Sequence, residues 1–174
     1  MIIRQEQKDD YETVYRFVQT AFETARVKDG TEQELVNKLR ESDRYIPELA
    51  LIAEEQGRMI GYLMLTKTSI TNADGEHEAL VLAPIAVAME HRNAGIGSEL
   101  MRAGMEKATA MGFKAIFLAG DTAYYTRFGF VPAIRHGIKC NLEIPEELVE
   151  NIMVCQLHPQ ALNGITGTFE FVLP

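Results

Sequence analysis

The 174-residue sequence has no tryptophan and only two cysteines, Cys140 and Cys155. Two cysteines that form no CxxC pair cannot build a disulfide framework, so we expect a reducing, cytoplasmic setting. The N-terminal residues lack the apolar core of a signal peptide. No apolar run approaches the roughly 18 residues that a membrane helix requires. We therefore expect no membrane association.

Basic residues are also scarce, since 17 Lys and Arg face 25 Asp and Glu and give a formal charge of −8. Binding to nucleic acid needs clustered basic side chains, so this balance argues against it. The four histidines are scattered without the spacing of metal ligands, which predicts no structural or catalytic metal. The acidic balance favours solubility and is compatible with a cationic partner such as an amine.

Length and composition fit one globular domain over residues 1–174, with 47% hydrophobic and 24% charged residues and no linker or repeat. Hydrophobic periodicity predicts an α/β fold. The expected order is a strand at 1–4, helices at 11–22 and 31–40, strands at 48–54, 58–70 and 78–87, a helix at about 98–111, a strand at 114–119, a short helix at 123–128, a helix start at 145–147, and strands at 153–157 and 168–172.

Local signals set several helix boundaries. Asp9-Asp10 is expected to cap the first helix, and Thr31 with Glu34 has capping-box spacing before the second. Met111 is expected to close the buried stripe of the long helix, and Gly112 to end that helix.

The segment Arg92-Asn93-Ala94-Gly95-Ile96-Gly97 lies between a predicted strand and the long helix. A helix start exposes unpaired N–H groups, and glycines let the backbone approach a bulky anion, so the segment can form a pyrophosphate cradle. It lacks the GxxxxGK[ST] pattern of a P-loop, and Leu100 replaces the third glycine of a Rossmann fingerprint. Two interpretations remain: the Arg-x-x-Gly-x-Gly loop of CoA-dependent acyltransferases, and an ordinary strand–loop–helix turn.

Pro84 falls in an otherwise apolar strand, where it removes one ladder donor. It predicts that the strand is interrupted there, either by a plain edge bulge or by an opening that leaves the backbone of Ile85 and Val87 free. An extended ligand with amide groups could pair with those atoms as an added strand would.

Two tyrosines, Tyr124 and Tyr125, follow the next buried strand. A phenol is protonated at neutral pH, so it can donate a proton to a departing thiolate. The alternative interpretation is that both rings only fill the core or cover the surface.

Together these segments resemble the GNAT superfamily of N-acetyltransferases. The resemblance rests on Arg92-x-x-Gly95-x-Gly97, on the strand Leu82-Ala83-Pro84-Ile85-Ala86-Val87 before it, and on Tyr124-Tyr125-x-Arg127-Phe128-Gly129-Phe130. It is tightest to bacterial predicted N-acetyltransferases with a Gly-Asp-x-x-Tyr-Tyr-x-Arg-Phe-Gly-Phe signature, here Gly120 to Phe130. It implies a central mixed, mostly antiparallel sheet of six to seven strands, with the fourth and fifth strands splayed and about four flanking helices.

The resemblance also implies an activity, namely transfer of an acetyl group from acetyl-CoA to a primary amine of a small molecule or a protein, by direct attack in a ternary complex. Tyr125 takes the place of the general acid, and Tyr124, one residue away, packs or lines the pocket. The strand backbone pairs with pantetheine, and the loop binds the pyrophosphate. The cofactor-binding residues are then Ile85, Ala86, Val87, Arg92, Asn93, Ala94, Gly95, Ile96, Gly97 and Ser98.

Several points stay open. Glu76, Glu78 and Asp121 are candidates for the general base. A cysteine acyl-enzyme is disfavoured, because no motif surrounds either thiol and direct transfer is the norm of the resembled family. The acceptor, the acyl length and the oligomeric state are not readable, and a homodimer is one option. The alternative function is a non-catalytic CoA or acyl-CoA sensor or interaction module on the same fold, which would not need Tyr125.

Overall fold

The computed structural model describes residues 1–25 and 28–172. The α-helices in this part of the chain are α1 (Tyr11–Glu23), α2 (Glu32–Arg40), α3 (Ile96–Ala110) and α4 (Thr122–Tyr125). The strands are β1 (Ile2–Gln5), β2 (Ala50–Glu55), β3 (Arg58–Asn72), β4 (Gly75–Val87), β5 (Ala115–Ala119), β6 (Val131–Pro132), β7 (Ile138–Cys140), β8 (Ile152–Gln156) and β9 (Gly167–Phe169). Short 3-10 helices are η1 (Lys8–Asp10), η2 (Pro47–Leu49), η3 (Met89–His91), η4 (Thr126–Phe128), η5 (Ala133–His136) and η6 (Glu146–Asn151).

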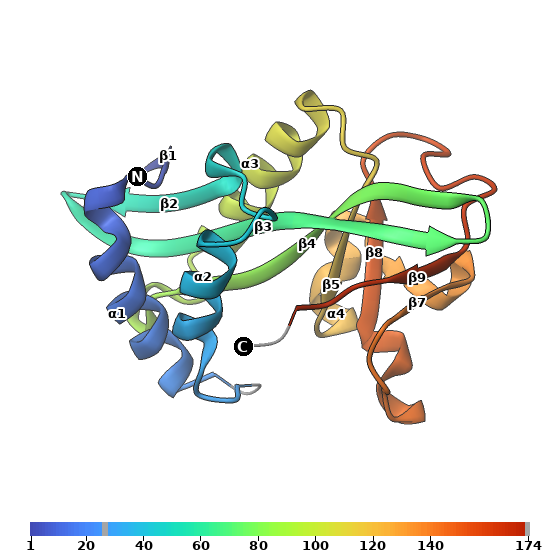
Figure 1. Ribbon diagram of the computed structural model, residues 1–174. Coiled ribbons are helices and arrows are strands. Elements are labelled where there is room, and N and C mark those ends of the chain that lie inside the picture. Colours follow the sequence, from blue (N-terminus) through green and yellow to red (C-terminus); the bar gives the residue numbers. More distant parts are fainter. Residues whose placement is uncertain (26–27, 173–174) are drawn as a thin grey trace. The chain divides into compact units, whose positions relative to one another are not determined.

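Hydrogen bonding gives the strand order β1-β2-β3-β4-β5-β8-β6, and β9 pairs with both β3 and β7 (Figure 1). Most pairs are antiparallel, but β4 and β5 run parallel. The mixed, mostly antiparallel sheet confirms the expected fold class. Its nine described strands exceed the expected six to seven because β6 and β7, which the sequence did not indicate, are only two and three residues long and carry little periodicity.

The chain forms two compact units. The first contains Met1–Thr66 and Ala83–Lys107, and the second contains Lys67–Leu82 and Ala108–Val172. Strands β3 and β4 therefore each contribute one segment to the first unit and one segment to the second. Burial of apolar side chains stabilises each unit, at roughly 25 cal/mol per Å² of apolar surface.

In the first unit, strand β3 separates two layers of helix. Successive strand residues point to opposite faces. On one face, the Tyr62 hydroxyl bonds the Glu6 carboxylate, which is also bound by Arg40 of α2. On the other face, Gly61 and Leu63 contact α3. Helices α2 and α3 therefore cover opposite faces of this strand.

The Glu6 carboxylate is the polar centre of the first unit. Its side chain is fully buried, and the Arg40 side chain is only 6% exposed. Glu6 accepts hydrogen bonds from Arg40 Nη2 (3.0 Å), Tyr45 Oη (2.8 Å) and Tyr62 Oη (3.0 Å), and the Arg40 guanidinium lies 3.8 Å from the Tyr11 ring centroid. Burial and the Glu6 carboxylate raise the pKa of both hydrogen-bonded tyrosines, so they remain donors. This network joins the end of β1 to α2 and β3.

In the second unit, β5 is the central strand. It pairs in parallel with β4 through Ile116 and Phe117, and antiparallel with β8 along its whole length. Phe117 stacks on Phe169 of β9 with ring centroids 4.0 Å apart. Four of the five β5 residues are buried, which explains its continuous apolar sequence.

Three expectations about helix ends were wrong. Asp10 does not cap α1 through its side chain, because its carboxylate accepts two bonds from the Arg4 guanidinium at 2.7 and 2.9 Å. Thr31 forms no capping box, because its hydroxyl donates to Asp29 instead. Met111 is 45% exposed, since α3 ends at Ala110 and the next residue leaves the helical stripe.

Three further expectations need correction. Strand β4 continues through Pro84 to Val87 without an interruption. The segment after Pro145 is a 3-10 helix, and the last strand ends at Phe169 instead of residue 172. Beyond Phe169 the chain is held by side chains, since Asn141 Oδ1 accepts from the Phe171 N–H at 2.8 Å.

Candidate active site

The loop between β4 and α3 presents a row of backbone donors. In the described structure, the N–H of Arg92 bonds Met89 and that of Ala94 bonds His91, whereas the first bond of α3 runs from Glu99 to Gly95. The N–H groups left without a partner among the described residues are those of Asn93, Gly95, Ile96, Gly97 and Ser98. They surround the N-terminus of a helix, where the macrodipole also favours an anion.

The backbone at this loop takes conformations that expose those donors. Asn93 and Gly95 have positive φ values of 64° and 85°. Successive N–H groups around such residues form concave anion sites. A Cβ built on Gly95 would meet nothing within 4 Å, so the space above the loop is open. The local geometry therefore fits a bound phosphate group.

Arg92 has a different role from the loop amides. Its Nη2 donates to the Ala21 carbonyl at 2.7 Å, and its Nη1 to the Thr24 carbonyl at 3.4 Å. Both carbonyls lie at the C-terminal end of α1, where orphan acceptors and the negative end of the dipole attract a guanidinium. The Arg92 side chain thus anchors the loop to α1.

Two glycines allow α3 to pack closely against β3. A Cβ on Gly61 would lie 2.8 Å from Leu100 Cδ1 and 3.0 Å from Ile96 Cγ2, and a Cβ on Gly104 would lie 3.1 Å from Leu63 Cδ2. Ile96 is the first residue of α3. The lack of a side chain at Gly61 therefore sets the position of the backbone N–H groups at the start of this helix. No sequence signal predicted this contact, because a glycine inside a strand is usually linked to a bulge or a turn.

The end of β4 leads directly into this loop. Pairing between β4 and β5 is described for Leu80 and Val81 and for no later described residue of β4. On its other edge β4 stays beside β3, and the Ala88 N–H still bonds the Ile60 carbonyl at 3.0 Å. Ile85 and Val87 are half-buried, whereas Ala86 is buried. The last residues of β4 therefore have backbone available on one edge.

In the second unit, Tyr125 ends the short helix α4. Asp121 caps this helix by accepting from the Ala123 N–H at 2.9 Å. The Tyr125 ring packs edge-on against Tyr124 and Phe130, with centroids 4.9 and 5.9 Å apart. Burial, with the nearby Tyr124 and Asp121, raises the Tyr125 pKa to about 12. The phenol is therefore protonated throughout the physiological range.

The Tyr125 ring lies directly over Gly120. A Cβ on Gly120 would be 2.3 Å from Tyr125 Cε2, so a larger residue there would displace the ring. Asn151 holds Gly120 from both sides, since Gly120 N–H donates to the Asn151 carbonyl and Asn151 Nδ2 donates to the Gly120 carbonyl, each at 2.9 Å. Gly120 was part of the signature read from the sequence, but nothing in the sequence indicated Asn151.

Tyr124 has packing partners. Its ring lies 5.6 Å from the Phe128 ring, and the Arg127 guanidinium is 4.6 Å from its centroid. Arg127 Nε also donates to the Tyr124 carbonyl at 2.9 Å. These contacts support the interpretation that Tyr124 packs.

The remaining candidates differ in surroundings. Glu76 and Glu78 are exposed, and the Asp121 carboxylate is engaged in capping α4. Both cysteines are free, and burial raises the pKa of the Cys155 thiol to about 11, which makes it a poor nucleophile. Among residues 1–25 and 28–172, no cluster of His, Cys, Asp and Glu could hold a metal. No helix described there is long and apolar enough to span a bilayer.

Comparison with known proteins places this arrangement in a family. The family described as acetyltransferase (GNAT) domain matches residues 2–133. The chain is 31% identical over 172 residues to the uncharacterized N-acetyltransferase YhbS of Escherichia coli strain K12, covering 98% of this chain and 96% of that protein. It is 34% identical over 117 residues to the uncharacterized N-acetyltransferase YjhQ of the same strain, covering 67% of this chain and 65% of that protein.

Solved structures agree. The crystal structure of E. coli YhbS in complex with CoA matches with a TM-score of 0.85 and 27% identity, over 98% of this chain and 89% of that one. A GNAT family acetyltransferase from Brucella melitensis in complex with acetyl-CoA shares the fold, with a TM-score of 0.77 and 23% identity, over 98% of this chain and 95% of that one. The resemblance read from the sequence is confirmed at the level of the family: the chain belongs to the GNAT acetyltransferases.

Proposed function

We propose that this N-acetyltransferase moves an acetyl group from acetyl-CoA to a primary amine, by direct attack in a ternary complex. The observation that carries the proposal is the row of five unpaired N–H groups, from Asn93 to Ser98, at the start of α3. YhbS and the Brucella protein are bound to CoA and acetyl-CoA in their structures. The two free thiols agree with a cytoplasmic setting.

Different residues would bind different parts of acetyl-CoA. The N–H groups of Gly95, Ile96 and Gly97 would hold the pyrophosphate, because the helix dipole and unpaired donors act on it together. The free edge of β4 at Ile85 and Val87 would pair with the pantetheine amides as an added strand does. Bound acetyl-CoA supplies a thioester carbonyl that is open to attack by an amine.

Tyr125 would act at the sulfur. As the C–N bond forms and the C–S bond breaks, the amine loses a proton and the sulfur gains one. A thiol has a usual pKa of about 8.5, and the Tyr125 pKa is raised to about 12. Complete proton transfer from the phenol is therefore uphill. The main contribution of Tyr125 is a hydrogen bond that strengthens as negative charge collects on the sulfur, and solvent returns any proton that is transferred.

Cofactor binding is tested by changing one glycine of the loop. Gly95→Glu places a carboxylate and a strained backbone at the cradle, so CoA binding measured by calorimetry should be lost. Gly112→Glu is a matched control, because Gly112 has φ 86° against 85° for Gly95, is equally open, and lies at the other end of α3. Equal CoA affinity in both variants would refute the cradle.

Catalysis is tested by removing one hydroxyl. Tyr125→Phe keeps the ring packing, so CoA affinity and melting temperature should hold while kcat falls by about 10²- to 10³-fold, the range for losing one hydrogen-bond donor to a developing negative charge. Tyr124→Phe should cost far less, because Tyr124 packs against Phe128 and Arg127. The readout is release of free CoA across a panel of amines. Full turnover in a folded Tyr125→Phe enzyme would exclude this role, and no turnover of the wild-type enzyme with any amine would favour a CoA-binding module.

A further inference from the structure

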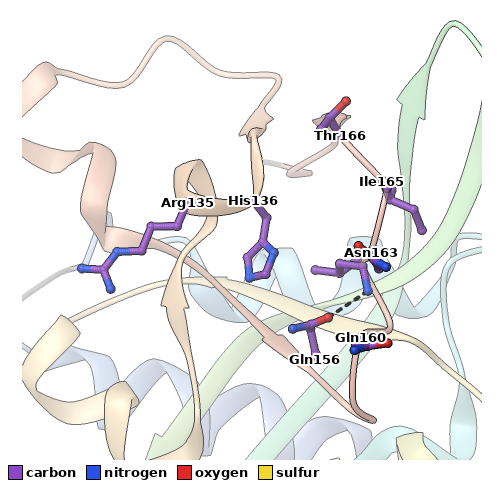
Figure 2. A pocket seen from close by; sticks show the side chains of 9 residues that line it. Arg135, His136, Gln156, Gln160, Asn163, Ile165 and Thr166 are labelled. Atoms are coloured by element: carbon purple, nitrogen blue, oxygen red, sulfur yellow. Dashed lines mark hydrogen bonds between the residues drawn. The ribbon is translucent and has the colours of Figure 1, made fainter.

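The second unit contains a hollow with no part in the proposed reaction. Its volume is about 360 Å³, near the lower end of the range for small-ligand sites. It lies between η5, the end of β8 and the loop that leads to β9 (Figure 2). The residues that line it are Arg135, His136, Gln156, Gln160, Leu162, Asn163, Gly164, Ile165 and Thr166.

None of these nine residues is acidic, although the chain carries a formal charge of −8. The hollow beside α1 in the first unit differs, since its lining mixes three glutamates with two arginines: Glu12, Glu23, Glu90, Arg16 and Arg58. The charged side chain of the second-unit hollow is that of Arg135. The lining of this hollow therefore carries a net positive charge.

One hydrogen bond fixes which groups face the hollow. Gln156 Oε1 accepts from the Leu162 N–H at 2.9 Å. The other end of this amide, Nε2, is consequently directed away from that bond as a donor. In Figure 2 the His136 ring points toward Gln156, whereas Arg135 extends away from the imidazole. The hollow thus combines two directed donors with a guanidinium at longer range.

The loop that closes the hollow is well anchored. Its start is held by the Leu157 N–H on the Lys114 carbonyl at 2.9 Å, and turns follow at Asn163 and Ile165, whose N–H groups bond carbonyls three residues back at 3.0 Å. Ala161, Leu162 and Ile165 are buried. The loop therefore forms a fixed wall of the hollow.

The hollow and Tyr125 are at opposite ends of β5. In the β5/β8 register, Gln156 faces Ala115 at the start of β5, and Ile152 faces Ala119 at its end. Tyr125 follows that end through Gly120. Four strand residues separate the two positions, which corresponds to about 13 Å along the strand. A ligand in the hollow would not reach the Tyr125 hydroxyl.

We propose that this hollow binds a small oxyanion, a carboxylate or a phosphate. The His136 ring N–H and Gln156 Nε2 donate to the anion, and Arg135 adds positive charge at the rim. The imidazole N–H of His136 and the Nε2 of Gln156 are hydrogen-bond donors that suit an oxyanion. Among the described residues, neither of these two donor atoms has a hydrogen-bond partner. None of the residues that line the hollow belongs to the proposed CoA cradle.

The test uses the full-length protein and NMR of its histidine rings. Succinate, inorganic phosphate and uncharged succinamide are titrated at constant ionic strength and pH. Succinate or phosphate should shift the His136 signal saturably, with a Kd of about 1 mM, while His77 and His91 stay unchanged. The difference between the two anions identifies which oxyanion is preferred.

Three variants make the test specific. Gln156→Glu keeps an oxygen for the Leu162 N–H but replaces the donor by a negative charge, so affinity should fall at least about tenfold. Arg135→Gln should weaken binding less, because the guanidinium acts at a distance. Tyr125→Phe should leave binding unchanged. Equal shifts with succinamide, shifts of all four histidines alike, or undiminished affinity in Gln156→Glu would overturn the proposal.

Discussion

Replacing Gly120 by alanine offers the most direct test of how Tyr125 is positioned. The added methyl group would lie 2.3 Å from Tyr125 Cε2, whereas ordinary van der Waals contact begins at 3.4 Å. The ring must therefore move by about 1 Å, because Asn151 holds Gly120 through two hydrogen bonds and limits movement of the backbone. A displacement of about 1 Å at a catalytic group can lower the rate by about 10²-fold.

The expected result is a fall in kcat of about 10²-fold with unchanged CoA affinity. Overpacking also costs about 1–3 kcal/mol of stability, so the melting temperature should fall by several degrees. Turnover is measured by release of free CoA well below the melting temperature of the variant. Calorimetry of CoA binding serves as the control for folding.

A double-mutant cycle separates positioning from general damage. In the Tyr125→Phe background the hydroxyl is already absent, so Gly120→Ala should lower kcat by less than about threefold. The same large fall in both backgrounds would refute the idea that Gly120 acts through the phenol. An unchanged kcat in Gly120→Ala alone would show that the position of this ring does not matter.

Three other predictions concern separate parts of the protein. Because the Tyr125 pKa is raised to about 12, turnover should rise from about pH 6 as the amine is deprotonated and should not fall again before about pH 10; a decline between about pH 8 and 9 would contradict this. Glu6→Gln leaves the buried Arg40 charge uncompensated, so the free energy of unfolding should fall by about 3–5 kcal/mol in thermal melts, whereas Glu12→Gln, in an exposed pair, should cost under about 1 kcal/mol. Gly61→Val should displace the start of α3 and weaken CoA binding in calorimetry by more than about tenfold, and an unchanged affinity would show that the donor row tolerates this shift.

Periodicity and glycine spacing predicted much of the fold. The strand–loop–helix at 92–97 and the short helix with Tyr125 occur where the sequence placed them, because both depend on local backbone rules. The errors at helix starts arose where another side chain already engaged the residue that was expected to cap the helix. Asp10 is a suitable cap by sequence, but its carboxylate is held by Arg4 across the start of the chain.

The contacts that position the site were not predictable in the same way. Arg92 is separated from its acceptor Ala21 by 71 residues, and Asn151 from Gly120 by 31. Hydrophobic patterns indicate which face of an element is buried, but they do not indicate which single atom it meets. The Arg92 motif was therefore recognised as part of a phosphate loop, while its anchoring bond to α1 came only from the structure.

Glycine has two physical uses in this chain, and the sequence reveals only one of them. Gly95 and Gly112 have positive φ and lie at helix ends, where turn rules predict them. Gly61 and Gly120 have no such conformation and matter because a side chain would collide with Leu100 or Tyr125. Each of these two glycines supports one half of the proposed chemistry, the donor row in the first unit and the phenol in the second. Substitutions at the two glycines should therefore affect binding or turnover in addition to stability, whereas loss of Glu6, whose carboxylate bonds Arg40, Tyr45 and Tyr62, should affect stability alone.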